Sequence, residues 1–296
     1  MRKAIRFLLA VLIVFALLLT VDTTSGFFYR TSTQMSVATT SPEGIASRTL
    51  LVFPGYAGDC HSISTAFAPR LIPGWQMVVL CYPEREIDDD QVFDLLRRYV
   101  EEAPQGSVTI LAGSMGGMVA VNFLDRLART NSNLRPDVRL LLDTSPPDRA
   151  FVKMSSFLPM SAWYRGGPIS SAIWYIGNVS MDHSALEPGA SLDIVRQGDR
   201  YFREIGMPAL ASQANYINEF RLDDHLHFRD LLATATFITA GEGGEDPMIK
   251  VSTSIEAWRK RLPELRVSTL NSREGSWHVP WTLRPQEVLT VVMSDQ

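Results

Sequence analysis

The sequence predicts an α/β protein in which helices flank a mostly parallel central sheet and a mainly helical insertion interrupts the pattern. Short β-prone apolar runs alternate with segments of helical spacing, as in chains built from βαβ units. The alternation stops at residues 149–233 and then resumes. The length of 296 residues suits one large α/β domain with such an insertion, or two small domains.

The N-terminal segment has the layout of a secretory signal and lies outside the α/β pattern. Basic side chains within residues 2–6 precede an uncharged apolar run over 7–21, and a small polar stretch ends at Gly26. The run is long for a signal peptide and slightly shorter than the roughly 17–25 residues of a spanning helix. Residues 1–26 are therefore either a signal peptide or a membrane anchor. Because the basic flank stays inside, the remainder is expected outside the cytoplasm, membrane-anchored through 7–21 or secreted.

Strands and helices are expected in alternation from Thr49 onward, after a Ser/Thr-rich stretch with a short edge strand. The strands are runs of β-prone apolar residues. We expect them at Met35–Ala38, Thr49–Phe53, Met77–Leu80, Val108–Leu111, Val138–Leu142, Thr236–Thr239 and Leu265–Leu270. The helices have apolar residues at helical spacing, and the first follows the N-cap candidates Asp88, Asp89 and Asp90. We expect them at Val92–Val100, Met118–Leu127, Ser254–Arg261 and Arg284–Met293.

The insertion divides the predicted core into two parts. The core comprises residues 27–148 and 234–296, and the insertion at 149–233 is rich in aromatic residues and methionine. Ligands of open α/β sheets bind at the carboxyl edge of the strands, so we expect the insertion to act as a cap over that edge. Its aromatic side chains suggest an acyl-chain pocket, although such residues more often pack helices together.

Two cysteines follow neighbouring parts of the predicted sheet. Cys60 lies just past the strand Thr49–Phe53, and Cys81 ends the strand Met77–Leu80. If those strands are parallel neighbours, both cysteines lie at the same edge of the sheet. Export makes a disulfide chemically possible, so we hypothesise a Cys60–Cys81 bridge, with two separate thiols as the alternative.

The strongest functional signal is a serine at a strand-to-helix turn. Ser114 has Ala112 two residues before it and Gly116 two residues after it, directly behind an apolar strand. A sharp turn needs small neighbours at both positions, because a branched side chain would clash there. The turn pushes the serine Oγ out of the sheet and leaves the N–H of Met115 free to donate to a developing oxyanion. The pattern is G-x-S-x-G with Ala112 in place of the first glycine.

A serine nucleophile needs a base, and the base needs a carboxylate partner. Of the five histidines, only His278 follows the final strand in a loop with small residues and then runs into a terminal helix. For the acid, Asp246 follows a strand in a glycine-rich loop, and Asp143 at the end of the preceding strand is the alternative. Glu242 and Glu245 lie near Asp246 and are interpreted as solvated charges.

The other histidines are weaker candidates. His61 is near the first loop and would reach the site only from the oxyanion side, and His183 falls in the predicted cap. His225 and His227 stand beside two aspartates, which suggests a metal site. Histidines two residues apart do not share a helix face, so we expect a solvated polar segment there instead.

These motifs, in this order, resemble the α/β-hydrolase superfamily of lipase-like and esterase-like serine hydrolases. The likeness runs from the first regular strand to the C-terminus. It is carried by the segments 53–58, 112–117, 241–247 and 275–278. The resemblance implies an α/β-hydrolase fold, with Ser114 as nucleophile, Asp246 as acid and His278 as base. It also implies an oxyanion hole formed by the N–H of Met115 and an N–H near Tyr56.

The implied reaction is hydrolysis of a carboxylic ester through an acyl-enzyme, with a small-molecule ester, a lipid or a thioester as substrate. We expect neither an organic cofactor nor a metal. An acyltransferase is one alternative, because the stretch Gly-Ser-Met-Gly-Gly-Met also resembles homoserine O-acetyltransferases. A non-catalytic ligand-binding homologue is the other. The net charge of −4 gives no reason to expect nucleic acid as a partner.

Overall fold

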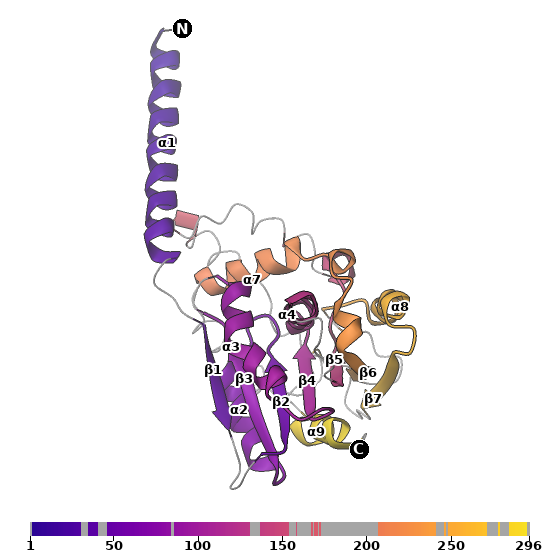
Figure 1. Cartoon of the computed structure of the whole chain (residues 1–296). Coiled ribbons are helices and arrows are strands. Elements are labelled where there is room, and N and C mark those ends of the chain that lie inside the picture. Colours follow the sequence, from indigo (N-terminus) through magenta and orange to yellow (C-terminus); the bar gives the residue numbers. More distant parts are fainter. Residues whose placement is uncertain are drawn as a thin grey trace.

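The described part of the chain contains one seven-stranded sheet with helices on both faces (Figure 1). The computed structural model describes residues 2–30, 35–40, 46–83, 86–130, 137–153, 158, 167, 169–170, 172, 207–240, 246, 248–270, 278 and 284–294. The strands are β1 (Ser36–Thr40), β2 (Arg48–Phe53), β3 (Trp75–Cys81), β4 (Val108–Gly113), β5 (Val138–Asp143), β6 (Leu232–Ala240) and β7 (Arg266–Leu270). The principal helices are α1 (Arg2–Arg30), α2 (Cys60–Phe67), α3 (Asp89–Glu101), α4 (Gly116–Thr130), α7 (Met207–Glu219), α8 (Val251–Arg261) and α9 (Pro285–Ser294).

The sheet is parallel except at one edge. Its strand order is β1-β3-β2-β4-β5-β6-β7, and β1 alone runs antiparallel, against β3. The predicted α/β class with a mostly parallel sheet is therefore confirmed, including the short edge strand. One boundary differs clearly, because β6 begins at Leu232 and not at Thr236. All the parallel strands end at one edge of the sheet, and their connecting loops meet there.

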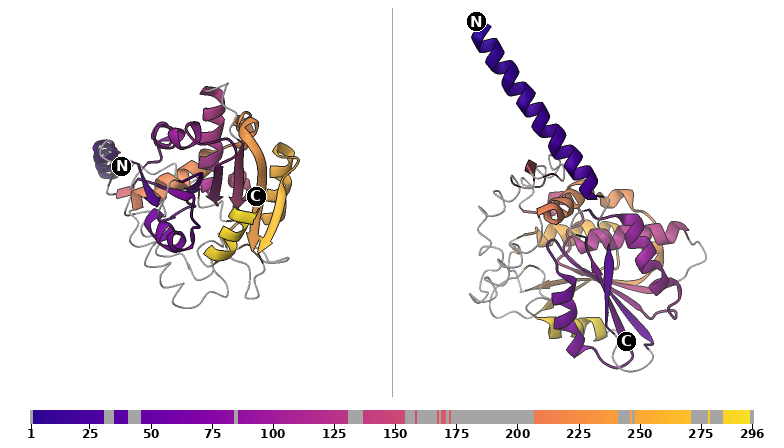
Figure 2. Two further views of the ribbon diagram at one scale, coloured as in Figure 1. Left: turned by 60° about the horizontal axis from the view of Figure 1, so that its bottom comes forward. Right: turned by 90° about the vertical axis from the view of Figure 1, so that its left-hand side faces the viewer.

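The strand residues alternate between two hydrophobic clusters on opposite faces of the sheet. Leu51 and Phe53 of β2 belong to the cluster that includes α3 and α4, whereas Leu50 and Val52 belong to the one with α2 and α9. Figure 2 (left) shows these two helix pairs on opposite sides of the sheet. Because side chains alternate along a strand, a continuous apolar run such as β2 is expected where both faces are covered.

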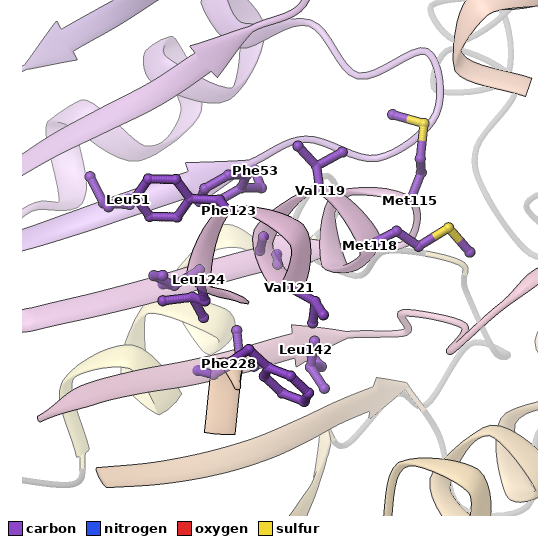
Figure 3. Packing of buried hydrophobic residues seen from close by; sticks show 14 of the residues in the cluster. Leu51, Phe53, Met115, Met118, Val119, Val121, Phe123, Leu124, Leu142 and Phe228 are labelled. Carbon is purple, nitrogen blue, oxygen red and sulfur yellow. The ribbon is translucent and has the colours of Figure 1, made fainter. Parts of the chain in front are cut away.

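Helix α4 is embedded in the larger cluster and begins two residues after Ser114. The ring of Phe123 lies 5.9 Å from the ring of Phe53 between centroids. Figure 3 shows Val121 turned toward Leu142 on the opposite flank of the helix. Contacts on both flanks fix the start of α4, and with it the turn that carries Ser114.

The two cysteines form the hypothesised bridge. Cys60 and Cys81 are joined by a disulfide, with their Cα atoms 5.1 Å apart. Cys60 opens α2 and Cys81 ends β3. The parallel pairing of β2 with β3 brings both positions to the carboxyl edge of the sheet, as expected.

Helix α1 projects away from the domain as a rod (Figure 1; Figure 2, right). Its apolar segment Lys3–Thr24 has a mean hydropathy of 2.8, and every residue of the segment except Asp22 is exposed. Within the described residues, it is the one helix long and apolar enough to cross a membrane. A signal sequence meets the same criteria, so length and composition alone leave both predicted roles of residues 1–26 open.

Most of the predicted cap at 149–233 lies outside the described residues, His183 among them. Its last part contains α7, which reaches the loop after β2. The side-chain oxygen of Gln213 accepts a hydrogen bond of 2.7 Å from the N–H of Ala57. A helix from the predicted cap therefore touches the carboxyl edge of the sheet.

Candidate active site

Ser114 sits on a sharp turn between β4 and α4. Its φ angle is 48°, in the left-handed region that side chains other than glycine rarely adopt. The N–H of Ser114 donates a 2.8 Å hydrogen bond to the carbonyl of Asp143 on the neighbouring strand. A Cβ added at Gly116 would overlap the carbonyl oxygen of Phe53, so only glycine fits two residues after the serine. The predicted need for small residues around Ser114 thus has a direct steric cause.

Ser114, His278 and Asp246 form a continuous hydrogen-bonded chain. Nε2 of His278 lies 2.8 Å from Oγ of Ser114. Nδ1 of the same ring lies 3.0 Å and 3.1 Å from the two carboxylate oxygens of Asp246. The three residues follow β4, β7 and β6, whose carboxyl ends meet at one edge of the sheet. Ser114 is only 8% exposed and the carboxylate of Asp246 is buried, so these hydrogen bonds are largely shielded from water.

The carboxylate of Asp246 is held by the backbone that follows it. Its Oδ1 accepts hydrogen bonds from the N–H groups of Met248 at 2.7 Å and Ile249 at 2.9 Å. These donors orient the carboxylate toward His278, and they stabilise its ionised form. A carboxylate so placed can fix the ring tautomer of His278 and stabilise its protonated state.

Asp143, the alternative acid, occupies a different place. It is fully buried at the end of β5, where its backbone carbonyl supports the Ser114 turn. Its Oδ1 lies 3.4 Å from the hydroxyl of Thr144. Among the described residues, the carboxylate that hydrogen-bonds to His278 is that of Asp246. Glu242 and Glu245 lie outside the described residues.

The two expected oxyanion donors lie in the turns after β4 and β2. Met115 directly precedes α4, and no acceptor in the described part of the chain takes its N–H. Tyr56 lies in the loop between β2 and α2. Burial raises the pKa of the Tyr56 phenol, so this side chain stays neutral. The expected pair thus corresponds to the N–H of Met115 on one side of Ser114 and the Tyr56 loop on the other.

The loop that holds Tyr56 is fixed from several directions. The hydroxyl of Tyr82 donates to the carbonyl of Pro54 at 2.7 Å, and the N–H of Gly58 donates to the carbonyl of Gly55 at 2.9 Å. Gln213 of α7 accepts the N–H of Ala57, as described above. Gln213 could not be predicted from the sequence, because nothing in the local pattern links a helix residue to a loop 156 residues earlier.

Backbone strain is concentrated at the same edge. Outside glycine, positive φ angles among the described residues occur at Ala57, Ser114 and Thr144, with values of 59°, 48° and 44°. The three follow β2, β4 and β5, which are neighbours in the sheet. Strained backbone of this kind costs free energy and gathers at functional sites. The clustering points to the carboxyl edge independently of any motif.

The other histidines that the structure describes, His61, His225 and His227, take no part in these hydrogen bonds. His61 is exposed on α2, near the sulfurs of Cys60 and Cys81. Cysteine binds metals as a thiolate, and these two sulfurs are bonded to each other, so this cluster is unsuited to a metal.

The interpretation of residues 223–227 as a solvated segment is wrong for His225. Its ring stacks on Phe220 with centroids 4.8 Å apart, and its side chain is 15% exposed. Burial lowers the pKa of His225, against the attraction of Asp125. The side chain of His227 is 53% exposed, as expected for such a segment.

Comparison with known proteins identifies the class. The sequence profile of the alpha/beta hydrolase family matches residues 26–291, so the chain belongs to this family. Among solved structures, it is similar to an esterase from Exiguobacterium antarcticum, an enol-lactonase from Burkholderia xenovorans LB400 and a bromoperoxidase from Bacillus anthracis. No curated protein matches it in sequence.

The structural likeness is one of fold. The TM-scores to the esterase, the enol-lactonase and the bromoperoxidase are 0.60, 0.61 and 0.61, at 11%, 13% and 9% identity. Each match covers 88% of this chain and 95%, 96% and 95% of the respective structure. At such identities the reaction does not transfer from a neighbour. The family supports a hydrolase acting on a small molecule.

Proposed function

We propose that this protein is a serine hydrolase that cleaves carboxylic esters through an acyl-enzyme. Ser114 is the nucleophile, His278 the general base and Asp246 the acid that orients it. One observation carries the proposal: both ring nitrogens of His278 have partners at 2.8–3.1 Å, the serine hydroxyl on one side and a carboxylate on the other. This arrangement lets the histidine act as a base toward the serine while the carboxylate orients its ring.

The steps follow from these contacts. Oγ of Ser114 bonds to the ester carbonyl carbon while Nε2 of His278 takes the hydroxyl proton. The resulting oxyanion accepts hydrogen bonds from the N–H of Met115 and from the Tyr56 loop. Collapse expels the alkoxide, which takes the proton from His278. A water molecule then repeats the sequence on the acyl-enzyme, which releases the carboxylic acid and restores Ser114.

Covalent labelling tests this proposal. A fluorophosphonate probe is expected to form one adduct on Ser114, and the Ser114→Ala variant to take none. The variant should also lose hydrolysis of p-nitrophenyl butyrate by several orders of magnitude, as triad serines do. Ser252→Ala is the matched control, because Ser252 is an exposed serine on α8. Its labelling and turnover should equal those of the wild type.

The outcomes separate the proposed hydrolase from the two alternatives. A wild-type protein that takes no label would indicate a ligand-binding homologue. Labelling at Ser114 with faster acyl transfer to an added alcohol than to water would indicate an acyltransferase. Unchanged turnover in Ser114→Ala would refute the assignment of the nucleophile.

We also propose an extracytoplasmic location. The basic flank and apolar helix of residues 1–26 support export. The Cys60–Cys81 disulfide is an independent support, because such bonds persist in oxidising compartments. Lipids are among the candidate substrates because this helix would bring the enzyme to a membrane.

A further inference from the structure

The exposed apolar surface of α1 fits the hydrocarbon core of a lipid bilayer. The window Lys3–Thr24 spans 22 residues, about 33 Å at the rise of an α-helix, which matches a hydrocarbon core of about 30 Å. Its apolar side chains point in all directions, and every residue of Lys3–Thr24 except Asp22 is exposed. A helix that is apolar all round suits lipid on every side. Its surface therefore fits a bilayer.

The far end of α1 is joined to the domain by a buried carboxylate. Asp22 is only 3% exposed. Its Oδ1 accepts hydrogen bonds from the N–H of Ile169 at 2.8 Å and of Ser170 at 3.2 Å. The hydroxyl of Ser170 in turn donates to the carbonyl of Gly167 at 3.2 Å. An acidic residue near the end of an apolar helix thus has specific partners almost 150 residues later in the chain.

The packing around this contact is close. A Cβ added at Gly167 would overlap both the backbone oxygen and the carboxylate of Asp22, so only glycine permits the approach. Cleavage after Gly26 would remove Asp22 and leave the N–H groups of Ile169 and Ser170 without this acceptor. These specific hydrogen bonds exist only while α1 is attached, so the contact favours a chain in which α1 is retained.

We propose that α1 is retained in the mature protein as a membrane anchor, and that Asp22 joins it to the segment 167–170. The anchor crosses the bilayer with its basic end inside the cytoplasm and the domain outside. Asp22 then lies at the outer end of the span, where its carboxylate is paired with protein backbone and not exposed to lipid. This inference does not depend on the catalytic assignment.

The first experiment asks whether α1 is retained. The full-length chain, with a C-terminal tag, is expressed in a bacterial host, and its membranes are washed with alkaline carbonate. We expect the protein to stay in the membranes, to need detergent for release, and to have an intact mass that includes residues 2–30. A soluble species that begins near Phe27 would overturn the proposal. Protease added to spheroplasts should digest the domain, and full protection would overturn the orientation.

The second experiment tests the Asp22 contact in detergent-solubilised protein. Asp22→Ala is expected to raise the amide hydrogen-exchange rate of the peptide holding residues 167–170 by about fivefold, because two donors lose their acceptor. Its Tm should fall by about 2–4 °C. Asp22→Asn keeps an acceptor oxygen, so its exchange rate and its Tm should lie between those of the wild type and those of Asp22→Ala. Thr23→Ala, on an exposed neighbour, is the control. Equal exchange in Asp22→Ala and Thr23→Ala would refute the contact.

Discussion

At the scale of single residues, the proposed chemistry depends on which nitrogen of His278 carries the proton. Nδ1 faces two carboxylate oxygens of Asp246, which only accept hydrogen bonds, so Nδ1 carries the hydrogen in the resting state. Nε2 is then unprotonated and accepts from the hydroxyl of Ser114. The neutral ring is therefore held in the tautomer that can act as a base.

Substitution of the two buried aspartates should separate their roles. Asp246→Asn is expected to lower kcat by about 10⁴-fold, because an amide can stabilise the wrong ring tautomer. Asp143→Asn keeps the backbone carbonyl that binds the N–H of Ser114, so kcat should change far less. Steady-state hydrolysis of p-nitrophenyl butyrate measures both. A larger loss in Asp143→Asn would transfer the acid role to that residue.

His225 gives a separate prediction about stability. Burial lowers its pKa from the ordinary value of 6.5, so the folded protein binds this proton less readily than the unfolded chain. As the pH falls through about 6.5, the unfolded state takes up more protons and the free energy of unfolding decreases. Replacing His225 with phenylalanine, which can still stack on Phe220, should reduce the loss of Tm between about pH 7.5 and pH 5.5.

The exposed His227 provides the control for this measurement. His227→Gln removes a neighbouring histidine whose side chain is 53% exposed, and it controls for the loss of a histidine from this segment. An identical pH dependence in the His225→Phe variant would exclude His225 as the cause.

At the scale of elements, α7 and the loop after β2 act together. Gln213 is buried on α7, and its acceptor oxygen holds the N–H of Ala57, the residue after Tyr56. Ala57 itself has a positive φ angle, so the loop needs such support to keep its conformation. Gln213 is thus a positioning residue for the proposed oxyanion donor.

The effect of Gln213 on turnover can be measured directly. Gln213→Ala should lower kcat by roughly tenfold with little change in KM, less than the 10²–10³ lost when an oxyanion donor is removed outright. Gln213→Glu retains an acceptor and should restore much of the activity. The control is Ser212→Ala, whose hydroxyl accepts from Ile87 away from the loop. Equal kcat in the Gln213→Ala and Ser212→Ala variants would exclude this role.

At the scale of the whole molecule, elements with a local physical cause could be predicted from the sequence. Asp88 caps α3 by accepting the N–H groups of Asp90 and Gln91, as its position before an apolar helical pattern indicates. The strands before Ser114 and Asp143 were visible as apolar runs with small or acidic ends. Ser114, Asp246 and His278 could also be proposed from the sequence, because each follows a predicted strand.

Features that depend on contacts between distant segments could not be predicted. The partners of Gln213 and Asp22 lie about 150 residues away along the chain, and a sequence pattern does not record them. His225 stacks on the nearby Phe220, but the carboxylate of Asp125 beside its ring comes from α4, and the sequence pattern does not record that contact. The beginning of β6 at Leu232 reflects pairing with β5, which extends the strand past its apolar centre.

The left-handed conformation of Ser114 also has a cost in the stability of the folded protein. A residue with a side chain costs about 1–2 kcal/mol in this region, against a total stability of about 5–15 kcal/mol for a typical protein. Ser114→Gly and Ser114→Ala both delete the hydroxyl, but glycine alone relieves the strain. The glycine variant should therefore melt about 2–4 °C above the alanine variant in calorimetry, and equal Tm values would show an unstrained turn. The positive φ angle that exposes the proposed nucleophile thus lowers the free energy of unfolding.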